Sequence, residues 1–233
     1  MTAAAPARCT AAAGRATLPA MSTAPSADAA RARFDAATAA HLTGRLTDDV
    51  ELVPASADDW DRHNRALWGD ATDRARPFDL AALMSDEQRV HGAALDALWP
   101  APLAHRILLR AGDDVVGAYW GTQDTWQRYY MVYSVVGRAW QRRGLYRALL
   151  ARVIAAAGAA GFREIYSRHA ADNNPVIIPK LQAGFVISGL ELTPRFGALV
   201  HLRYYLSDAL RAAHAYRVDG SRADVVRAHG LIE

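Results

Sequence analysis

A switch from strand-like to helix-like sequence between residues 129 and 157 limits the fold of this chain more than any other pattern. The apolar run YYMVYSVVG at 129–137 is followed by QRRG at 141–144 and then by an Ala- and Leu-rich run. In that last run, apolar residues recur at spacings that place them on one helix face. They are Leu145, Leu149, Leu150, Val153, Ile154 and Ala157. A strand that leads directly into an amphipathic helix predicts a crossover to a parallel neighbouring strand.

Further strand-like and helix-like runs lie on both sides of this switch. A strand from residue 50 precedes a helix that begins near Ser56, where Asp59 is the acidic partner of the N-cap. The other predicted elements are a helical stretch within 78–99, strands at 105–110 and 115–121 joined by a hairpin at Gly112–Asp114, a strand at 163–169, a helix at 175–183, and strands at 185–192 and 198–206. This order predicts an α/β (α+β) fold with a mixed central sheet of about seven strands flanked by helices.

Length and composition suit one globular domain with additional material at its ends. The chain has 233 residues, of which 52% are hydrophobic and 22% charged. Its first 30 residues are mostly Ala, Pro, Ser and Thr, so we predict a disordered or poorly ordered extension over 1–45, a domain over 46–206 and a helical tail over 207–233. Cys9 is the only cysteine, which excludes a disulfide framework and fits a cytoplasmic protein. We find no apolar segment long enough for a secretory signal or a membrane span.

The polar stretch before the predicted helix has the chemistry of an anion site. Gly144 allows close approach of a ligand to the backbone, and the first turn of a helix presents unbonded N–H groups. Arg142 and Arg143 add positive charge, so a diphosphate would satisfy this stretch. The same residues are equally compatible with an ordinary turn that carries solvated arginines. The P-loop and Rossmann glycine patterns are both absent, which disfavours those nucleotide-binding classes.

Two motifs together resemble the GNAT superfamily of N-acetyltransferases over residues 50–206. The acyl-CoA motif of that family, [Q/R]-x-x-G-x-[G/A], is matched at Gln141 and Gly144, whereas Tyr146 stands where Gly or Ala is usual. The second motif is an Asn before a short helix that ends in Gly-Phe. It corresponds to DNNPVIIPKLQAGF, which ends at Gly184–Phe185. The resemblance implies the acyl-CoA N-acyltransferase fold.

The resemblance also implies acetyl-CoA as co-substrate and no metal. The residues that it places at the cofactor are Val135, Val136, Gln141, Arg142, Arg143, Gly144, Leu145, Tyr146, Asn173 and Asn174. Local chemistry by itself predicts that Asn174 caps the short helix and that Pro175 is its first residue.

By the same resemblance, the chain is an N-acetyltransferase that moves the acetyl group to a primary amine of a small molecule or peptide by direct attack. The backbone N–H near Ser134 would polarise the acetyl carbonyl. Tyr130 stands where histone-acetylating relatives carry a Glu and could hold a water, since a phenol is a poor base near neutral pH. His169 is the remaining titratable candidate, although a structural role at a strand end also explains it. Lys180 stands where many relatives have a proton-donating Tyr.

Two alternative functions remain at this point. The missing Tyr and Glu favour a catalytically weak acyl-CoA-binding protein, and abundant arginine would suit a nucleic-acid binder. Near-balanced charge, with 27 basic and 24 acidic residues, disfavours nucleic acid as a partner. We expect an amine acceptor and no membrane partner, and a homodimer is left open. Arg65, Arg74 and Arg76 would suit an acceptor that also bears a carboxylate or phosphate.

Overall fold

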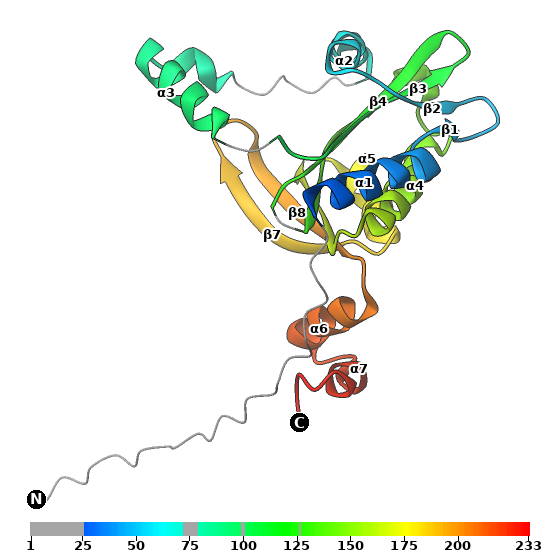
Figure 1. The fold of residues 1–233 in the computed structure, drawn as a ribbon, viewed down its shortest axis with the longest axis vertical. Coiled ribbons are helices and arrows are strands. Elements are labelled where there is room, and N and C mark those ends of the chain that lie inside the picture. The colour runs from blue at the N-terminus through cyan, green and yellow to red at the C-terminus, as the bar shows by residue number, and fades with distance from the viewer. Residues whose placement is uncertain (1–25, 72–78, 99–100, 126) are drawn as a thin grey trace, which may run out of the picture.

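An eight-stranded mixed sheet forms the centre of the computed structural model, which describes residues 26–71, 79–98, 101–125 and 127–233 (Figure 1). The strand order is β1-β2-β3-β4-β5-β6-β8-β7, and all neighbours are antiparallel except β5 and β6. The strands are β1 (Gly44–Arg45), β2 (Glu51–Pro54), β3 (Ala104–Ala111), β4 (Asp114–Gln123), β5 (Arg128–Val136), β6 (Glu164–Ala170), β7 (Val186–Thr193) and β8 (Gly197–Tyr205). The predicted mixed sheet is confirmed, with β1 as one strand more than expected.

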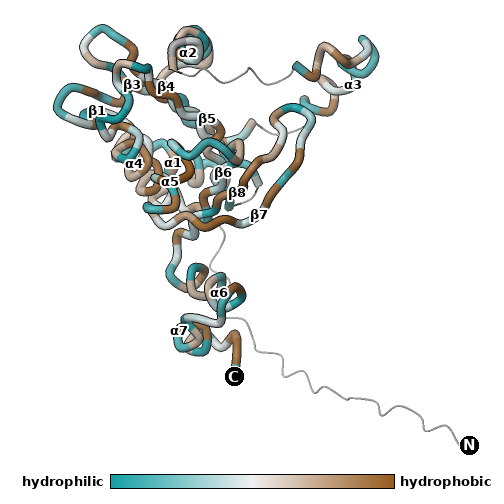
Figure 2. Tube along the Cα trace, turned by 180° about the vertical axis from the view of Figure 1, so that it is seen from behind, coloured by the Kyte–Doolittle hydropathy of each residue, from teal (hydrophilic) through white to brown (hydrophobic). Residues whose placement is uncertain are grey.

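Helices cover the sheet on both faces. One face carries α1 (Ala27–His41), α4 (Leu145–Ala160) and α5 (Asn174–Gln182), whose buried residues share a core cluster with the strands. The other face carries α2 (Ala57–Ala71), where Trp60 and Leu67 pack against β3, β4 and β5. The remaining helices are η1 (Leu80–Leu83), α3 (Asp86–Ala97), η2 (Arg138–Trp140), α6 (Asp208–Asp219) and α7 (Ala223–Ala228). Figures 1 and 2 show α6 and α7 beyond the end of the sheet.

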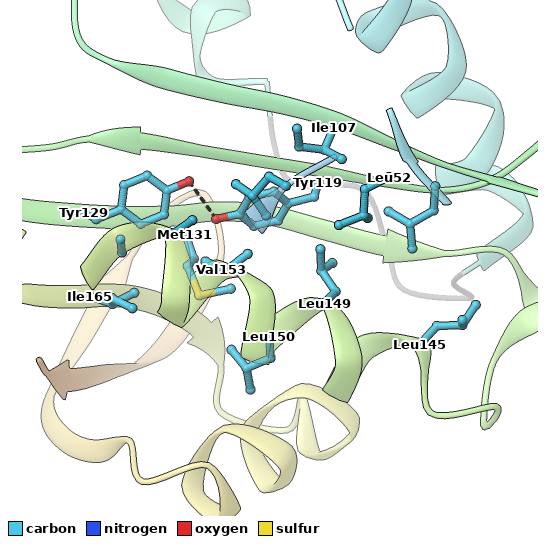
Figure 3. Packing of buried hydrophobic residues seen from close by; sticks show 14 of the residues in the cluster. Leu52, Ile107, Tyr119, Tyr129, Met131, Leu145, Leu149, Leu150, Val153 and Ile165 are labelled. Atoms are coloured by element: carbon cyan, nitrogen blue, oxygen red, sulfur yellow. Dashed lines mark hydrogen bonds between the residues drawn. The ribbon is translucent and has the colours of Figure 1, made fainter. Parts of the chain in front are cut away.

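The crossover helix α4 supplies much of the core. Leu149 and Val153 point from α4 toward the sheet, whereas Leu150 points from the other side of the helix toward α5 (Figure 3). Together with Leu145, these side chains are at most 4% exposed. Burial of each such side chain contributes roughly 1.5–3 kcal/mol. The predicted apolar residues of this helix therefore join the core, some against the sheet and some on the side of α5.

The predicted disorder of residues 1–45 is wrong for residues 26–45, which form α1 and β1. Residues 1–25 lie outside the described residues. Phe34 is 4% exposed and stacks on His105 at 4.1 Å between ring centroids. Thr38 Oγ1 and Tyr129 Oη lie 2.8 and 2.7 Å from the two ring nitrogens of His105, so α1 is also tied to the sheet by hydrogen bonds. The Ala-rich sequence of α1 gives little sign of this docking, because only two of its side chains are buried in the core.

Two predicted helix boundaries also need correction. The single helix predicted within 78–99 is divided at Ser85, whose side chain and that of Gln88 form a capping box that starts α3. The N-cap of α5 is Asn173 rather than Asn174, because the N–H groups of Val176 and Ile177 both donate to the Asn173 carbonyl. Pro175 is consequently the second residue of α5. By contrast, Ser56 caps α2 as predicted, accepting from the Asp59 N–H at 3.1 Å.

Candidate active site

The parallel strands β5 and β6 pair over three residues and then separate. Their register runs from Arg128↔Glu164 to Tyr130↔Tyr166, whereas β6 continues to pair with β8 as far as Ala170. We call the opening beyond Tyr130 and Tyr166 the fork. Strand edges inside it keep N–H and C=O groups available to an extended ligand, as in β-strand addition.

A β-bulge on β5 lies at the start of the fork. Trp120 of β4 pairs with Tyr133 and the next residue pairs with Met131, which leaves Val132 as the extra residue. Before the bulge, Tyr129 and Met131 belong to the core under α4; after it, Tyr133 and Val135 belong to the cluster under α2. The bulge thus changes which face of the sheet each side chain joins.

The backbone after the bulge has N–H groups directed into the fork. Gly137 donates to Val116 of β4 at 2.8 Å, and the groups of an antiparallel strand alternate in direction. The N–H groups of Tyr133 and Val135 therefore point toward β4, whereas the N–H groups of Ser134 and Val136 point toward the fork. The position predicted for Ser134 is compatible with a carbonyl-polarising donor.

The loop between η2 and α4 has the geometry of an anion site. Arg142 and Gly144 both have left-handed backbone, with φ of 62° and 82°. Alternation of such conformations directs successive N–H groups to one side. Among the described residues no side chain caps α4, and a Cβ at Gly144 would meet nothing within 4 Å. The loop therefore has both open space and unbonded N–H groups at the positive end of a helix.

Side chains around this loop have structural partners. Gln141 Nε2 donates to the carbonyls of Val136 and Ala71, each at 3.0 Å, and so holds the loop on β5 and α2. The guanidinium of Arg143 lies over the Trp140 ring at 4.6 Å, whereas Arg142 is exposed. Leu145 is buried in the core, so the backbone is the part of it that a ligand could reach.

Tyr146, which departs from the family motif, does not occupy the loop. Its hydroxyl is buried and has no hydrogen-bond partner among the described residues. Burial raises the pKa of the nearby Tyr119, and Tyr129 and then Tyr146 add to this effect. Burial raises the pKa of Tyr146 itself. The Tyr at this position therefore packs toward the sheet and leaves the space over Gly144 open.

The far side of the fork is formed by the end of β6 and the start of α5. Asn173 is half-buried and Asn174 exposed at this helix start. Lys180, the only lysine in the sequence, is 1% exposed, and its Nζ lies 3.4 Å from Met131 Sδ. Burial lowers the pKa of Lys180 to about 7. The side chain thus reaches under the fork and does not extend to solvent.

His169 lies on the same face as Lys180. Its Nε2 is 3.1 Å from Ser167 Oγ, and burial followed by the charge of Lys180 lowers the pKa of His169 to about 2. A histidine with so low a pKa does not take up a proton near neutral pH. We therefore do not propose His169 as the general base.

The opposite face of the sheet carries a polar cluster that sequence reasoning missed. Arg168 donates to Tyr130 Oη at 3.3 Å and to Glu191 at 3.1 Å. His201 lies 2.8 Å from Glu191 Oε2 and 3.1 Å from the Tyr166 hydroxyl. Alternation in REIYSRHA separates Tyr166 and Arg168 from the buried Ile165 and Ser167, but nothing local relates them to β7 and β8. Of the acceptor arginines, Arg65 is exposed on α2, and Arg74 and Arg76 lie outside the described residues.

A fork in a mixed sheet, with a bulge on one strand and an uncapped helix start beside it, defines an acyl-CoA N-acyltransferase fold. Residues 65–179 match the model of the acetyltransferase (GNAT) family, and the chain belongs to that family of acyltransferases. No curated protein matches the chain significantly.

Solved structures with the same fold extend over most of the chain. The ribosomal-protein-S18-alanine N-acetyltransferase from Escherichia coli is 15% identical with a TM-score of 0.50, and the match covers 68% of this chain and 94% of that one. The spermidine/spermine N-acetyltransferase from Vibrio cholerae is 14% identical with a TM-score of 0.50, with coverage of 72% and 98%. At such identities the similarity shows the fold. Within the described part of the chain, no helix combines the length and apolar character needed to cross a membrane.

Proposed function

We propose that the protein transfers the acetyl group of acetyl-CoA to a primary amine of a small molecule or peptide by direct attack. The observation that carries this proposal is the fork itself. Its open β5 edge, with the N–H groups of Ser134 and Val136, lies next to the unbonded N–H groups at the start of α4. An extended arm with a diphosphate at one end fits both features.

The residues present fit acetyl-CoA as the co-substrate. Backbone N–H groups at residues 142–146 would hold the diphosphate, and Arg142 is free to add charge from the surface. Asn173 would contact the pantetheine arm from the other side of the fork. When bound, acetyl-CoA supplies an acyl thioester that is already activated toward an amine.

Groups of the protein itself would then orient the two substrates and polarise the acetyl carbonyl. The Ser134 N–H would donate to the acyl oxygen, whose negative charge increases during attack. Lys180 would stabilise a thiolate at the fork, because its amine is buried and has no carboxylate partner among the described residues. Tyr130 would face the acceptor from the face of the sheet opposite Lys180 and α4.

The second candidate is an acyl-CoA-binding protein without efficient turnover. It is favoured by Tyr130 and Lys180, which stand where relatives carry the Glu and the Tyr that handle protons. This candidate shares the binding site and differs only in chemistry. A test must therefore measure binding and transfer separately.

Calorimetric titration with acetyl-CoA tests the binding part. We expect wild-type protein to bind and Gly144→Glu to lose roughly tenfold or more in affinity, because φ of 82° strains a non-glycine residue and the carboxylate repels phosphate. Gly220→Glu is the matched control, since Gly220 also has positive φ and open space but lies at the end of α6. Equal binding by wild type and Gly144→Glu would contradict the assigned site.

Release of free thiol tests the transfer part. Wild-type protein with acetyl-CoA is offered spermidine, a peptide with an N-terminal alanine, and free amino acids. Acetylated product with equimolar thiol supports the enzyme. Tight binding without transfer to any amine supports the second candidate.

A further inference from the structure

Three side chains on the face of the sheet opposite α4 form a continuous chain of hydrogen bonds. Tyr166 on β6 is at the last rung before the fork, His201 is on β8 and Glu191 is on β7. The Tyr166 hydroxyl lies 3.1 Å from His201 Nδ1, and His201 Nε2 lies 2.8 Å from Glu191 Oε2. This series of hydrogen bonds therefore leads from the start of the fork to the edge strand of the sheet.

The chemistry of the partners sets the direction of these bonds. An ionised carboxylate can only accept, so His201 donates through Nε2 and its Nδ1 is left to accept from the Tyr166 hydroxyl. Hydrogen bonds from His201 and from Arg168 lower the pKa of Glu191, which keeps it ionised. The result is a carboxylate, an imidazole and a hydroxyl in series, with the imidazole held in one tautomer.

We propose that Glu191, His201 and Tyr166 form a proton relay that deprotonates the acceptor's ammonium group at the fork. This inference rests on the proposed amine acetylation. It supplies a general base in a chain that has Tyr130 where histone-acetylating relatives carry a Glu. Tyr166 is the group nearest the fork, and Glu191 and His201 act through it as positioning and proton-accepting residues.

The proposed step balances protons and electrons. The ammonium nitrogen gives one proton to Tyr166 Oη while Tyr166 passes its own proton to His201 Nδ1, which leaves an imidazolium paired with Glu191. The free amine then forms a bond to the acyl carbon, the carbon–sulfur bond breaks, and its electron pair leaves on sulfur. The second proton of the nitrogen goes to sulfur, and His201 returns its proton to solvent.

Neighbouring groups suit this role. Burial raises the pKa of Tyr166, so the phenol is not ionised on its own and needs a partner that takes its proton. The Tyr130 ring is 5.5 Å from that of Tyr166 and completes the wall beside the fork. The charged groups facing the relay are Arg128 and Arg203 over the Tyr166 ring, Glu164 bound to Arg203, and Arg168 bound to Glu191. Ser188 Oγ also donates to the His201 carbonyl at 3.4 Å.

Tyr166→Phe and His201→Gln test the relay with two nucleophiles. The first is the alkylamine acceptor from the panel, or n-butylamine if the panel gives none; it is an ammonium ion at neutral pH. The second is hydroxylamine, which is largely unprotonated there. We expect both variants to lose roughly 100-fold or more in kcat with the alkylamine at neutral pH. Their rates should recover as pH rises, and their rates with hydroxylamine and their acetyl-CoA affinities should match the wild type.

A second readout does not depend on turnover. Nitrogen-15 NMR of the histidine rings should show His201 as the Nε2–H tautomer in the wild type, with the Nδ1 resonance shifted in Tyr166→Phe. Tyr205→Phe and His214→Gln are matched controls, because these rings also lie against each other, at 5.2 Å, near the same sheet. Neither control should change the preference between nucleophiles.

The outcomes separate the two proposals. Equal losses with the alkylamine and hydroxylamine, no loss with either, or an Nδ1–H tautomer would overturn the relay while leaving acetyl transfer intact. Binding of acetyl-CoA by the wild type with no transfer to either nucleophile would overturn the proposed function and the relay with it.

Discussion

At the scale of single residues, Lys180 is the most unusual side chain in the molecule. A charged amine at 1% exposure normally has an ion-pair partner, whereas this one lies against a methionine sulfur and the Phe185 ring. Its pKa of about 7 means that the folded protein binds this proton more weakly than the unfolded chain, whose lysine has the ordinary value of 10.5. Keeping such a residue destabilises the fold, which is typical of a side chain retained for function.

Replacement of Lys180 with Met should therefore stabilise the protein. Between pH 7 and 10.5 the unfolded state binds more protons, so wild-type stability should rise with pH by about 1.4 kcal/mol per unit. Lys180→Met should remove this slope and gain a few kcal/mol, with the largest gain at pH 7 and below. Urea unfolding at pH 7, 8 and 9 measures both effects, with the exposed Arg195→Met as control. Parallel pH dependences of wild type and Lys180→Met would contradict the lowered pKa.

At the scale of elements, α1 shows how a weakly patterned helix becomes part of a fold. Phe34 and Ala37 are its buried residues, and Arg33 Nε donates to the Ala159 carbonyl at 2.6 Å near the end of α4. A few contacts of this kind fix α1 on the domain, because its partners are residues of α4 and β3 that are already packed in the core.

Phe34→Ala should destabilise the protein by about 3–5 kcal/mol, since it leaves a cavity beside His105 and Phe162. Asp35→Ala, next to it on the exposed side of α1, should change stability by less than about 0.5 kcal/mol. Chemical denaturation followed by tryptophan fluorescence compares the two variants. Similar stability of Phe34→Ala and wild type would mean that α1 is not docked.

At the scale of the whole molecule, the site and the C-terminal helices are far apart. The fork lies between β5 and β6, whereas α6 and α7 lie beyond the opposite end of the sheet (Figure 1). Their link to the sheet includes the bond from Arg211 to the Tyr205 carbonyl at 2.7 Å, and Ala212 and Val226 are their buried residues.

Truncation after Leu206 should consequently leave acetyl-CoA affinity unchanged while it lowers thermal stability. Truncation after Gly220, which removes only α7, is the milder comparison. Calorimetry and thermal melts on the two shortened proteins provide the measurement. Loss of acetyl-CoA binding in a truncated protein that still melts cooperatively would show that these helices support the fork.

Much of this architecture follows from local sequence. Period-2 and helical spacings predict the order of elements from β2 to β8, and Gly144 marks the loop before α4, because these properties depend on neighbours along the chain. What tertiary structure decides is which distant residues meet. Glu191, His201 and Tyr166 adjoin because β8 lies between β6 and β7, Lys180 is buried because α5 lies over the fork, and the bulge at Val132 sets which side chains face α2. No local pattern contains that information, since hydrogen bonds between strands and burial against helices depend on segments far apart in the chain.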